Sequence, residues 1–461
     1  NLLCLIFFKS NIKYKIQGTK IMKFFQALIL ASFLTSTSLF ASSLDSNDQQ
    51  KIIDHFNAYV DDGKIPQVSI LIKQDNKEIF RHVYGKADLA SNTEADKDTI
   101  YRIYSMSKPV TGVAIMQLLE NGKLRLNDKV SKFIPAFKNT KVLNTKFQDY
   151  VVKPKREITI RDLLTHTSGL TYSWAGEGPV HQIYRKYNIR PYYFGSLDAE
   201  LGKFPGTTCQ FASIAASAPL LHNPGEEWSY GINMDILGCV VEVVSGMSFA
   251  DYLDKNIFNP LKMNTTGFAV KPNDKKSFTS LYTSGAFSRD GEIVGPLGAN
   301  YADLEFSKSL RSIDAFDKSP YLENSSKLYD GGSGLVSSID DYSIFSEMLL
   351  NNGELNGVRI LSAASVELMS RNHLDLDDSE AATFGVSGLG FGLTVGVLED
   401  AGLAGMFGSD GQYFWGGAAS TTFWVDPDKK ITAVLMTQFM PSDKYPLRED
   451  LRALLYSGIS N

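Results

Sequence analysis

Ser105 and Lys108 are the residues of this chain best placed to carry out chemistry. An apolar stripe follows them and predicts an amphipathic helix that ends at Asn121-Gly122; its members are Val110, Val113, Leu118 and Leu119. Residues three apart share one face of a helix, so the lysine amine can take the proton of the serine hydroxyl and make it a nucleophile. Backbone N–H groups at the helix start would face an incoming anion. The alternative role for Ser105 is a helix N-cap.

Four further segments give this pair its context. They are 158–170, which contains Thr-His-Thr-Ser-Gly; 223–230, Asn-Pro-Gly-Glu-Glu-Trp-Ser-Tyr; 331–335, Gly-Gly-Ser-Gly-Leu; and 414–417, Phe-Trp-Gly-Gly. With Ser-Met-Ser-Lys at 105–108, they make the chain resemble the serine β-lactamase-related superfamily of penicillin-recognising hydrolases. Within that superfamily the chain is most similar to class C β-lactamases and to family VIII carboxylesterases. The resemblance extends from about residue 67 to the C-terminal helix.

The resemblance implies a β-lactamase/transpeptidase-like fold of the α/β plus α class, an antiparallel sheet flanked by N- and C-terminal helices. Residue patterns predict a matching order of elements: helix 46–61, strands 67–74 and 78–84, strands 412–425 and 431–439, and helix 447–456. We expect one hydrolase domain, 44–461. Its α/β part would comprise 44–135 and 326–461, and a mostly helical insert would comprise 136–325. A site is expected in the cleft between the two.

The same resemblance assigns roles to individual residues. Ser105 matches the nucleophile that becomes acylated, and Lys108 and Tyr230 match the pair that acts as base and proton donor. Trp415, Gly416 and Gly417 match the third motif, on an edge strand where substrate binds. The N–H of Ala418 would form an oxyanion hole with the N–H of Ser105. Because glycine has no side chain, we expect substrate to lie directly along Gly416 and Gly417.

Two departures from the β-lactamase pattern favour ester substrates. The asparagine of the Tyr-x-Asn motif is displaced by one residue, to Asn233. Trp415 stands where Lys or His would bind the β-lactam carboxylate, and a neutral ring offers no charge-assisted hydrogen bond. We therefore expect a serine hydrolase that cleaves carboxylic esters (EC 3.1.1.-). The alternatives are an amide hydrolase of the β-lactamase, D-alanyl-D-alanine carboxypeptidase or D-aminopeptidase type, and a non-catalytic penicillin-binding-like sensor.

Several other side chains near these motifs are expected to have structural roles. We expect His166 to anchor a loop rather than act as a base, and Asp235 to support the helix after Tyr230. Trp415 fits a cleft wall and core packing equally. A set of aromatic residues between positions 172 and 194 either lines an acyl pocket or packs in the core: Tyr172, Trp174, Tyr184, Tyr187, Tyr192, Tyr193 and Phe194.

Composition excludes several classes of partner. The net charge is −5 and no run of Lys and Arg occurs, which argues against nucleic acid. The histidines show no metal-ligand spacing, and no cofactor or metal is expected. The expected partner is a small-molecule ester or amide substrate. We expect no stable membrane span in the protein, and its oligomeric state stays open.

The first 41 residues are set apart from the fold. Residues 22–41 begin with Met-Lys, continue through an apolar stretch and end at Ala41, which is typical of a signal peptide. We expect export, to the periplasm in preference to full secretion, and take residues 1–21 as either an upstream segment or one of untranslated origin. Cys4 lies in this leader. A buried free thiol is the default for Cys239, and a Cys209–Cys239 disulfide is the alternative in an oxidising compartment.

Overall fold

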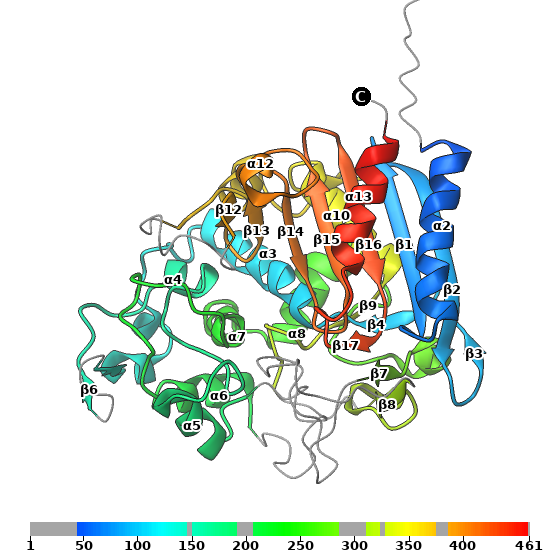
Figure 1. Ribbon diagram of the computed structural model, residues 1–461. Helices are drawn as coiled ribbons and strands as arrows, with labels where there is room; N and C mark the ends of the chain where they lie inside the picture. The colour runs from blue at the N-terminus through cyan, green and yellow to red at the C-terminus, as the bar shows by residue number, and fades with distance from the viewer. Residues whose placement is uncertain are drawn as a thin grey trace, which may run out of the picture. The chain divides into compact units, whose positions relative to one another are not determined.

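An eight-stranded antiparallel sheet is the centre of the fold (Figure 1). The computed structural model describes residues 44–144, 150–190, 206–284, 310–322, 328–374 and 386–459. In spatial order the strands are β12 (Leu389–Phe391), β13 (Gly396–Leu398), β14 (Tyr413–Gly416), β15 (Thr422–Asp426), β16 (Ile431–Met436), β1 (Gln67–Gln74), β2 (Lys77–Asp88) and β3 (Thr93–Glu94). The expected fold class is confirmed.

Helices cover both faces of this sheet. α2 (Ser46–Asp61) and α13 (Leu447–Gly458) pack together on one face, and α10 (Ile339–Leu350) packs against β1, β15 and β16 on the other. A strand covered on both faces has almost no solvent-facing side chain, so its sequence is apolar nearly throughout. β16 shows this, because it is buried throughout and has one polar residue, Thr432. β1 is buried at all but one residue, although half of its residues are polar.

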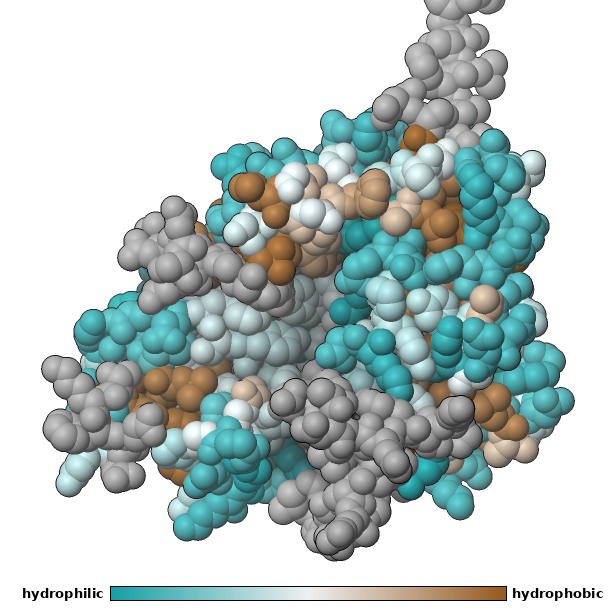
Figure 2. Space-filling model, viewed as in Figure 1, coloured by the Kyte–Doolittle hydropathy of each residue, from teal (hydrophilic) through white to brown (hydrophobic). Residues whose placement is uncertain are grey.

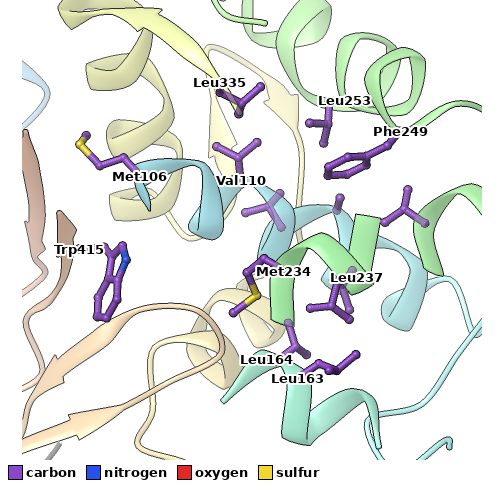
Figure 3. Close-up of a cluster of buried hydrophobic side chains, with 14 of the residues drawn as sticks. Met106, Val110, Leu163, Leu164, Met234, Leu237, Phe249, Leu253, Leu335 and Trp415 are labelled. Carbon is purple, nitrogen blue, oxygen red and sulfur yellow. The ribbon is translucent and has the colours of Figure 1, made fainter. Parts of the chain in front are cut away.

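α3 (Ser107–Glu120) is the helix that follows Ser105, and it runs through the middle of the molecule. The expected amphipathic character is wrong, because every residue from Ser107 to Leu118 is buried. Figure 3 shows the reason: leucine, methionine and phenylalanine side chains of other helices surround the start of α3. They come from α4 (Ile160–Leu164), α7 (Asn233–Ser245) and α8 (Phe249–Leu253).

The remaining elements are short. The other helices are α5 (Pro179–Lys186), α6 (Thr208–Ala215), α9 (Asn259–Leu261), α11 (Ala363–Met369) and α12 (Ala401–Ala404). Small sheets pair β4 (Ile100–Arg102) with β9 (Val336–Ser338), β5 (Val142–Leu143) with β6 (Val151–Val152), and β10 (Glu354–Leu355) with β11 (Val358–Arg359). β7 (Leu281–Thr283) lies between β8 (Arg311–Asp314) and β17 (Phe439–Met440). The region expected as a helical insert, 136–325, therefore also contains strands.

The single strand expected over 412–425 is two strands. β14 ends at Gly416, the chain turns through 417–421, and β15 returns antiparallel to β14. The Gly417 N–H donates to the Thr421 carbonyl at 2.9 Å, and Ser420 adopts a left-handed φ of 63° in this turn. β14 is also not an edge strand, because β13 pairs with its other side. Small residues at 416–420 allow this reversal inside an otherwise apolar run.

Two observations concern the surface and the ends of the chain. Within the described ranges no single helix is long and apolar enough to span a membrane; α7 and 249–261 meet that test only as a pair bent by 77°. The face in Figure 2 is mainly hydrophilic, with several small, separate hydrophobic groups; one of them is near α12, where Leu403 and Phe407 are exposed. Residues 1–21, the expected signal peptide 22–41 and Cys4 lie outside the described residues.

A disulfide joins Cys209 of α6 to Cys239 of α7, so the expectation of a free thiol at Cys239 is wrong. Because α6 and α7 pack against each other, they bring two cysteines 30 positions apart to a Cα–Cα distance of 4.8 Å. α7 begins three residues after Tyr230, so the disulfide braces the helix that follows the expected base.

Reduction of this disulfide is expected to lower the free energy of unfolding by about 3–4 kcal/mol, because the unfolded chain is then no longer closed into a loop between two cysteines 30 positions apart. Denaturant unfolding with and without reductant measures the change. The Cys209→Ala/Cys239→Ala double variant serves as control, because its midpoint should not respond to reductant. An equal midpoint for the reduced and oxidised wild type would contradict the prediction.

Candidate active site

Ser105 lies at a strained start of the central helix. It belongs to a short 3₁₀ turn, η1 (Tyr104–Met106), directly before α3, and is 8% exposed. Tyr104, the residue before it, has a φ of 42°. This lies in the left-handed region, which costs a non-glycine residue about 1–3 kcal/mol to adopt. The Tyr104 side chain is fully buried in a small cluster with Leu281, Ala419 and Met440, which holds this conformation. The turn therefore presents the Ser105 hydroxyl in one fixed position.

The structure brings the three expected catalytic residues together. Lys108 Nζ lies 2.9 Å from Ser105 Oγ, and the Tyr230 hydroxyl lies 2.8 Å from the same oxygen. Lys108 is fully buried, and its Nζ is 4.7 Å from the centroid of the Tyr230 ring. Helical spacing places Lys108 beside Ser105, whereas Tyr230 arrives from 125 residues along the chain, just before α7. The serine hydroxyl thus has two potential proton acceptors in contact with it.

The loop Gly331-Gly332 holds the lysine from behind. Lys108 Nζ donates to the Gly332 carbonyl at 2.8 Å, and Thr111 Oγ1 donates to the Gly331 carbonyl at 2.7 Å. A Cβ on Gly331 would lie 2.4 Å from the Met234 carbonyl oxygen, so only glycine allows the loop to approach α7 this closely. The glycine motif therefore fits between α3 and α7 and fixes the Lys108 amine.

Two aspartates accept hydrogen bonds from the backbone of this loop. Asp330 Oδ1 accepts from the N–H groups of Gly332 (2.9 Å) and Ser333 (2.8 Å), and its Oδ2 accepts from Ser333 Oγ at 2.6 Å. Asp235 Oδ1 accepts from the same Gly332 N–H at 3.1 Å. Asp235 therefore contacts the loop behind Lys108, beyond its expected support of the helix after Tyr230. Sequence reasoning missed Asp330, and its place directly before Gly-Gly-Ser-Gly was the available signal.

These two carboxyl groups cannot both ionise easily. Burial raises the pKa of Asp235 well above its usual range, and the negative charge of Asp330 and a hydrogen bond to it raise that pKa further. The opposing influences are the charge of Lys108 and the Gly332 N–H. We infer that Asp235 is protonated in the folded protein, where burial and the negative charge of Asp330 both oppose its ionisation.

His166 is a loop anchor, as expected. Its ring is fully buried, with Nδ1 2.7 Å from Asn233 Nδ2, and its carbonyl accepts from the Ser229 N–H at 2.7 Å. Burial, and secondly the charge of Lys108, hold the pKa of His166 well below its usual range, so the imidazole is neutral. Asn233 also accepts from Ser168 Oγ and is fully buried. The displaced asparagine is therefore used inside the protein.

Aromatic side chains surround the Tyr230 ring. Trp415 lies 5.8 Å away, Tyr172 5.4 Å and Trp228 5.9 Å between ring centroids, and Phe391 packs 5.2 Å from Trp415. Trp415 is 6% exposed, so it belongs to the core as well as to the wall of the site (Figure 3). Trp228 and Phe391 were not expected at the site.

The proposed aromatic acyl pocket is only partly assembled at the site. Tyr172 stacks on Trp174 at 4.9 Å and contacts Tyr230. Tyr184 is fully buried, and Tyr187 is 58% exposed. The other three members lie outside the described residues: Tyr192, Tyr193 and Phe194.

Gly416 and Gly417 are glycines because the protein itself occupies the space of their side chains. A Cβ on Gly416 would lie 2.6 Å from the guanidinium carbon of Arg448. A Cβ on Gly417 would lie 2.3 Å from the Ile103 carbonyl oxygen. These close approaches press 417–418 against the residues just before Ser105. The room expected for substrate at the missing side chains is therefore filled by Arg448 and Ile103.

Within the described residues no group of three or more His, Cys, Asp and Glu side chains is arranged to hold a metal ion. The chemistry available is that of a serine hydroxyl with an amine and a phenol in contact with it. Such a group can attack a carbonyl carbon and pass its proton to either neighbour.

Known proteins resemble this chain over most of its length. Esterase EstB of Burkholderia gladioli is 28% identical over 409 residues, covering 86% of this chain and 92% of EstB. Protein Rv1367c of Mycobacterium tuberculosis is 29% identical over 390 residues, covering 83% of this chain and 88% of its own length. The structure of EstCE1, a hydrolase with promiscuous acyltransferase activity, superposes with a TM-score of 0.72 at 27% identity, covering 89% of this chain and 99% of EstCE1.

The family model described as Beta-lactamase matches residues 52–457. That range takes in Ser105, Lys108, Tyr230 and the 415–418 segment as well as all strands of the central sheet. With this match over most of its length, the chain belongs to the beta-lactamase family of serine hydrolases and their relatives.

Proposed function

We propose that this protein hydrolyses carboxylic esters through a covalent acyl intermediate on Ser105. The observation that carries the proposal is the double contact at Ser105 Oγ, with Lys108 Nζ at 2.9 Å and the Tyr230 hydroxyl at 2.8 Å. A serine hydroxyl becomes a useful nucleophile only where a neighbour accepts its proton. Similarity to Esterase EstB and to the hydrolase EstCE1 supports the same reaction class.

The reaction proceeds in two halves. In the first, the Ser105 Oγ proton passes to the Lys108–Tyr230 pair while Oγ bonds to the ester carbonyl carbon, and the carbonyl oxygen takes the negative charge. The N–H groups of Ser105 and Ala418 hold that oxyanion. On collapse, the C–O bond to the alcohol breaks and the pair returns the proton to the leaving alkoxide. In the second half, water loses a proton to the pair as its oxygen bonds to the acyl carbon. The bond between that carbon and Ser105 Oγ then breaks, the pair returns the proton to Oγ, and the carboxylic acid leaves.

The surroundings of Ser105 favour esters over β-lactams. Asn233 is buried and bonded to His166 and Ser168, so its amide does not anchor a substrate amide. Trp415 packs against Tyr230 and Phe391 and brings no positive charge to the third motif. Aromatic walls with few charged groups suit an apolar acyl chain.

We also propose that the protein is exported. The Met22-Lys23 leader and the small residue Ala41 support export through a signal peptide. The Cys209–Cys239 disulfide supports it independently, because disulfides persist in oxidising compartments such as the periplasm.

The first test is hydrolysis of a short p-nitrophenyl ester, with a chromogenic cephalosporin in parallel. We expect ester turnover with little cephalosporin cleavage, and a loss of about 10³-fold or more in Ser105→Ala, since the nucleophile is gone. Ser107→Ala is the matched control: Ser107 Oγ accepts from the Leu335 N–H at 3.1 Å and is not placed at the reacting bond. Full ester turnover by Ser105→Ala would contradict the proposal, and preference for the cephalosporin would replace it with the β-lactamase alternative.

A further inference from the structure

The peptide unit between Gly417 and Ala418 lies against Ile103 and Tyr104, which lead into the nucleophile, and β14 contacts the η1 turn that contains Ser105. Gly417 approaches Ile103 so closely that a Cβ would meet the Ile103 carbonyl oxygen at 2.3 Å, and Ala418 packs against the cluster that contains Tyr104. Among the hydrogen bonds of the described residues, none gives the Ala418 N–H an acceptor. This N–H is therefore available next to Ser105, which is where an oxyanion would form in the proposed reaction.

A guanidinium from the C-terminal helix holds the other end of this peptide unit. Arg448 of α13 donates from Nη2 to the Gly417 carbonyl at 2.9 Å and to the Thr421 carbonyl at 3.1 Å. The same side chain lies over Gly416, whose missing Cβ leaves room for it. None of the ion pairs within the described residues involves Arg448. Its charge is directed at the two backbone carbonyls of the turn.

The Gly417 carbonyl and the Ala418 N–H belong to one planar amide group. A charged donor on the carbonyl fixes the plane of that amide and so fixes the direction in which the N–H points. It also polarises the amide, and cooperative strengthening of this kind is about 10–30% per bond. An oxyanion-hole donor is worth about 10²–10³-fold in rate when it is well aimed, so modest misalignment has a measurable effect.

We infer that Arg448 is a positioning residue for the oxyanion-binding N–H of Ala418. It acts through the Gly417 carbonyl rather than by contact with substrate, and this inference rests on the ester hydrolysis proposed above. Through this contact, the positions of β14, the 417–421 turn and α13 affect the rate of the reaction at Ser105. It also explains why position 416 has no side chain, since any Cβ would displace the guanidinium.

The test compares kcat and KM of Arg448→Met and Arg448→Lys on a neutral ester, p-nitrophenyl acetate, and on an anionic one, the p-nitrophenyl monoester of succinate. An oxyanion donor acts in the transition state, so we expect kcat to fall about 10- to 100-fold for Met with KM changed less than about threefold. The loss should be equal for the two esters. Both bonds come from the one nitrogen Nη2, and a lysine ammonium also has several donors but stands on a shorter side chain, so Lys should recover only part of the rate.

Arg452→Lys on the same helix is the matched control, because Arg452 contacts Gln412 and the Trp424 ring and not the turn. It is expected to keep kcat while it lowers the melting temperature. Unchanged kcat in a folded Arg448→Met would overturn the inference. A loss confined to the anionic ester, seen as raised KM, would overturn it too, since Arg448 would then bind the substrate carboxylate. If Met does not fold, the Lys variant decides between the same outcomes. A failure of the proposed function is recognised separately: the wild type would not hydrolyse the ester, or Ser105→Ala would hydrolyse it equally well.

Discussion

Replacement of Lys108 by Met is expected to lower kcat/KM for ester hydrolysis by about 10³–10⁴-fold, and Tyr230→Phe by about 10²–10⁴-fold. Both residues contact Ser105 Oγ, and proton transfer by a positioned group is worth effects of this size. Methionine matches the length of the lysine side chain, so the buried space stays filled. The Gly332 carbonyl loses its donor, which costs about 1–3 kcal/mol of stability without unfolding the protein.

The double variant tells whether the two residues act as one unit. If Lys108 and Tyr230 share the proton of Ser105, Lys108→Met/Tyr230→Phe should be scarcely slower than the slower single variant. Rate constants for acylation and deacylation, measured with a p-nitrophenyl ester before and after the burst, give the comparison. Strict multiplication of the two losses would mean independent roles, and near-normal turnover in either single variant would remove that residue from the base.

Thr111→Val is the control for movement of the loop behind the lysine. Thr111 donates to the Gly331 carbonyl at 2.7 Å but does not contact Ser105. We expect it to cost about 1 kcal/mol of stability and less than tenfold in kcat/KM. A loss as large as that of Lys108→Met would show that loop position, rather than the amine, accounts for the effect.

Asp330→Asn is expected to lower the free energy of unfolding by about 3–5 kcal/mol, whereas Asp235→Asn should change it by less than about 1 kcal/mol near pH 5. Asp330 is fully buried and accepts three hydrogen bonds from the loop that holds Lys108. An asparagine amide has one acceptor oxygen in place of two, so it leaves a buried donor without an acceptor. The raised pKa of Asp235 favours its neutral, protonated form, and the neutral asparagine amide can donate to Asp330 in the same way.

The pH dependence of unfolding separates these roles. The pKa of Asp235 is raised in the folded protein, so its contribution to stability is present below about pH 4 and is lost as pH rises toward the folded pKa. The unfolded chain releases this proton first, and the folded state therefore binds more protons across that window. Relative to wild type, Asp235→Asn should gain stability between pH 5 and pH 8. Denaturant midpoints at both pH values measure this, and a parallel decline of both proteins would disprove the raised pKa of Asp235.

Local sequence was sufficient wherever function depends on neighbours along the chain. Helix 46–61 and strand 67–74 occur at the predicted residues, because their apolar spacing matches burial against the sheet and against α13. Ser105 and Lys108 meet because three residues make almost one helical turn. The resemblance to a known family added Tyr230 and the 415–418 segment, which no local pattern could have linked to Ser105.

The tertiary structure decided which distant groups complete the site. Arg448 acts through the backbone carbonyl of Gly417, and any peptide group offers the same atom, so sequence carries no specific signal for this contact. Asp330 acts through the N–H of Gly332, and only its place before Gly-Gly-Ser-Gly marked it in the sequence. The Cys209–Cys239 bridge depends on α6 packing against α7. The turn at 417–421 was hidden within an apolar run and depends on Gly417 lying against Ile103. Residue types and short spacings determined the nucleophile and its first neighbour, while packing between elements far apart in sequence determined how that nucleophile is aimed, because only the folded chain brings those atoms within bonding distance.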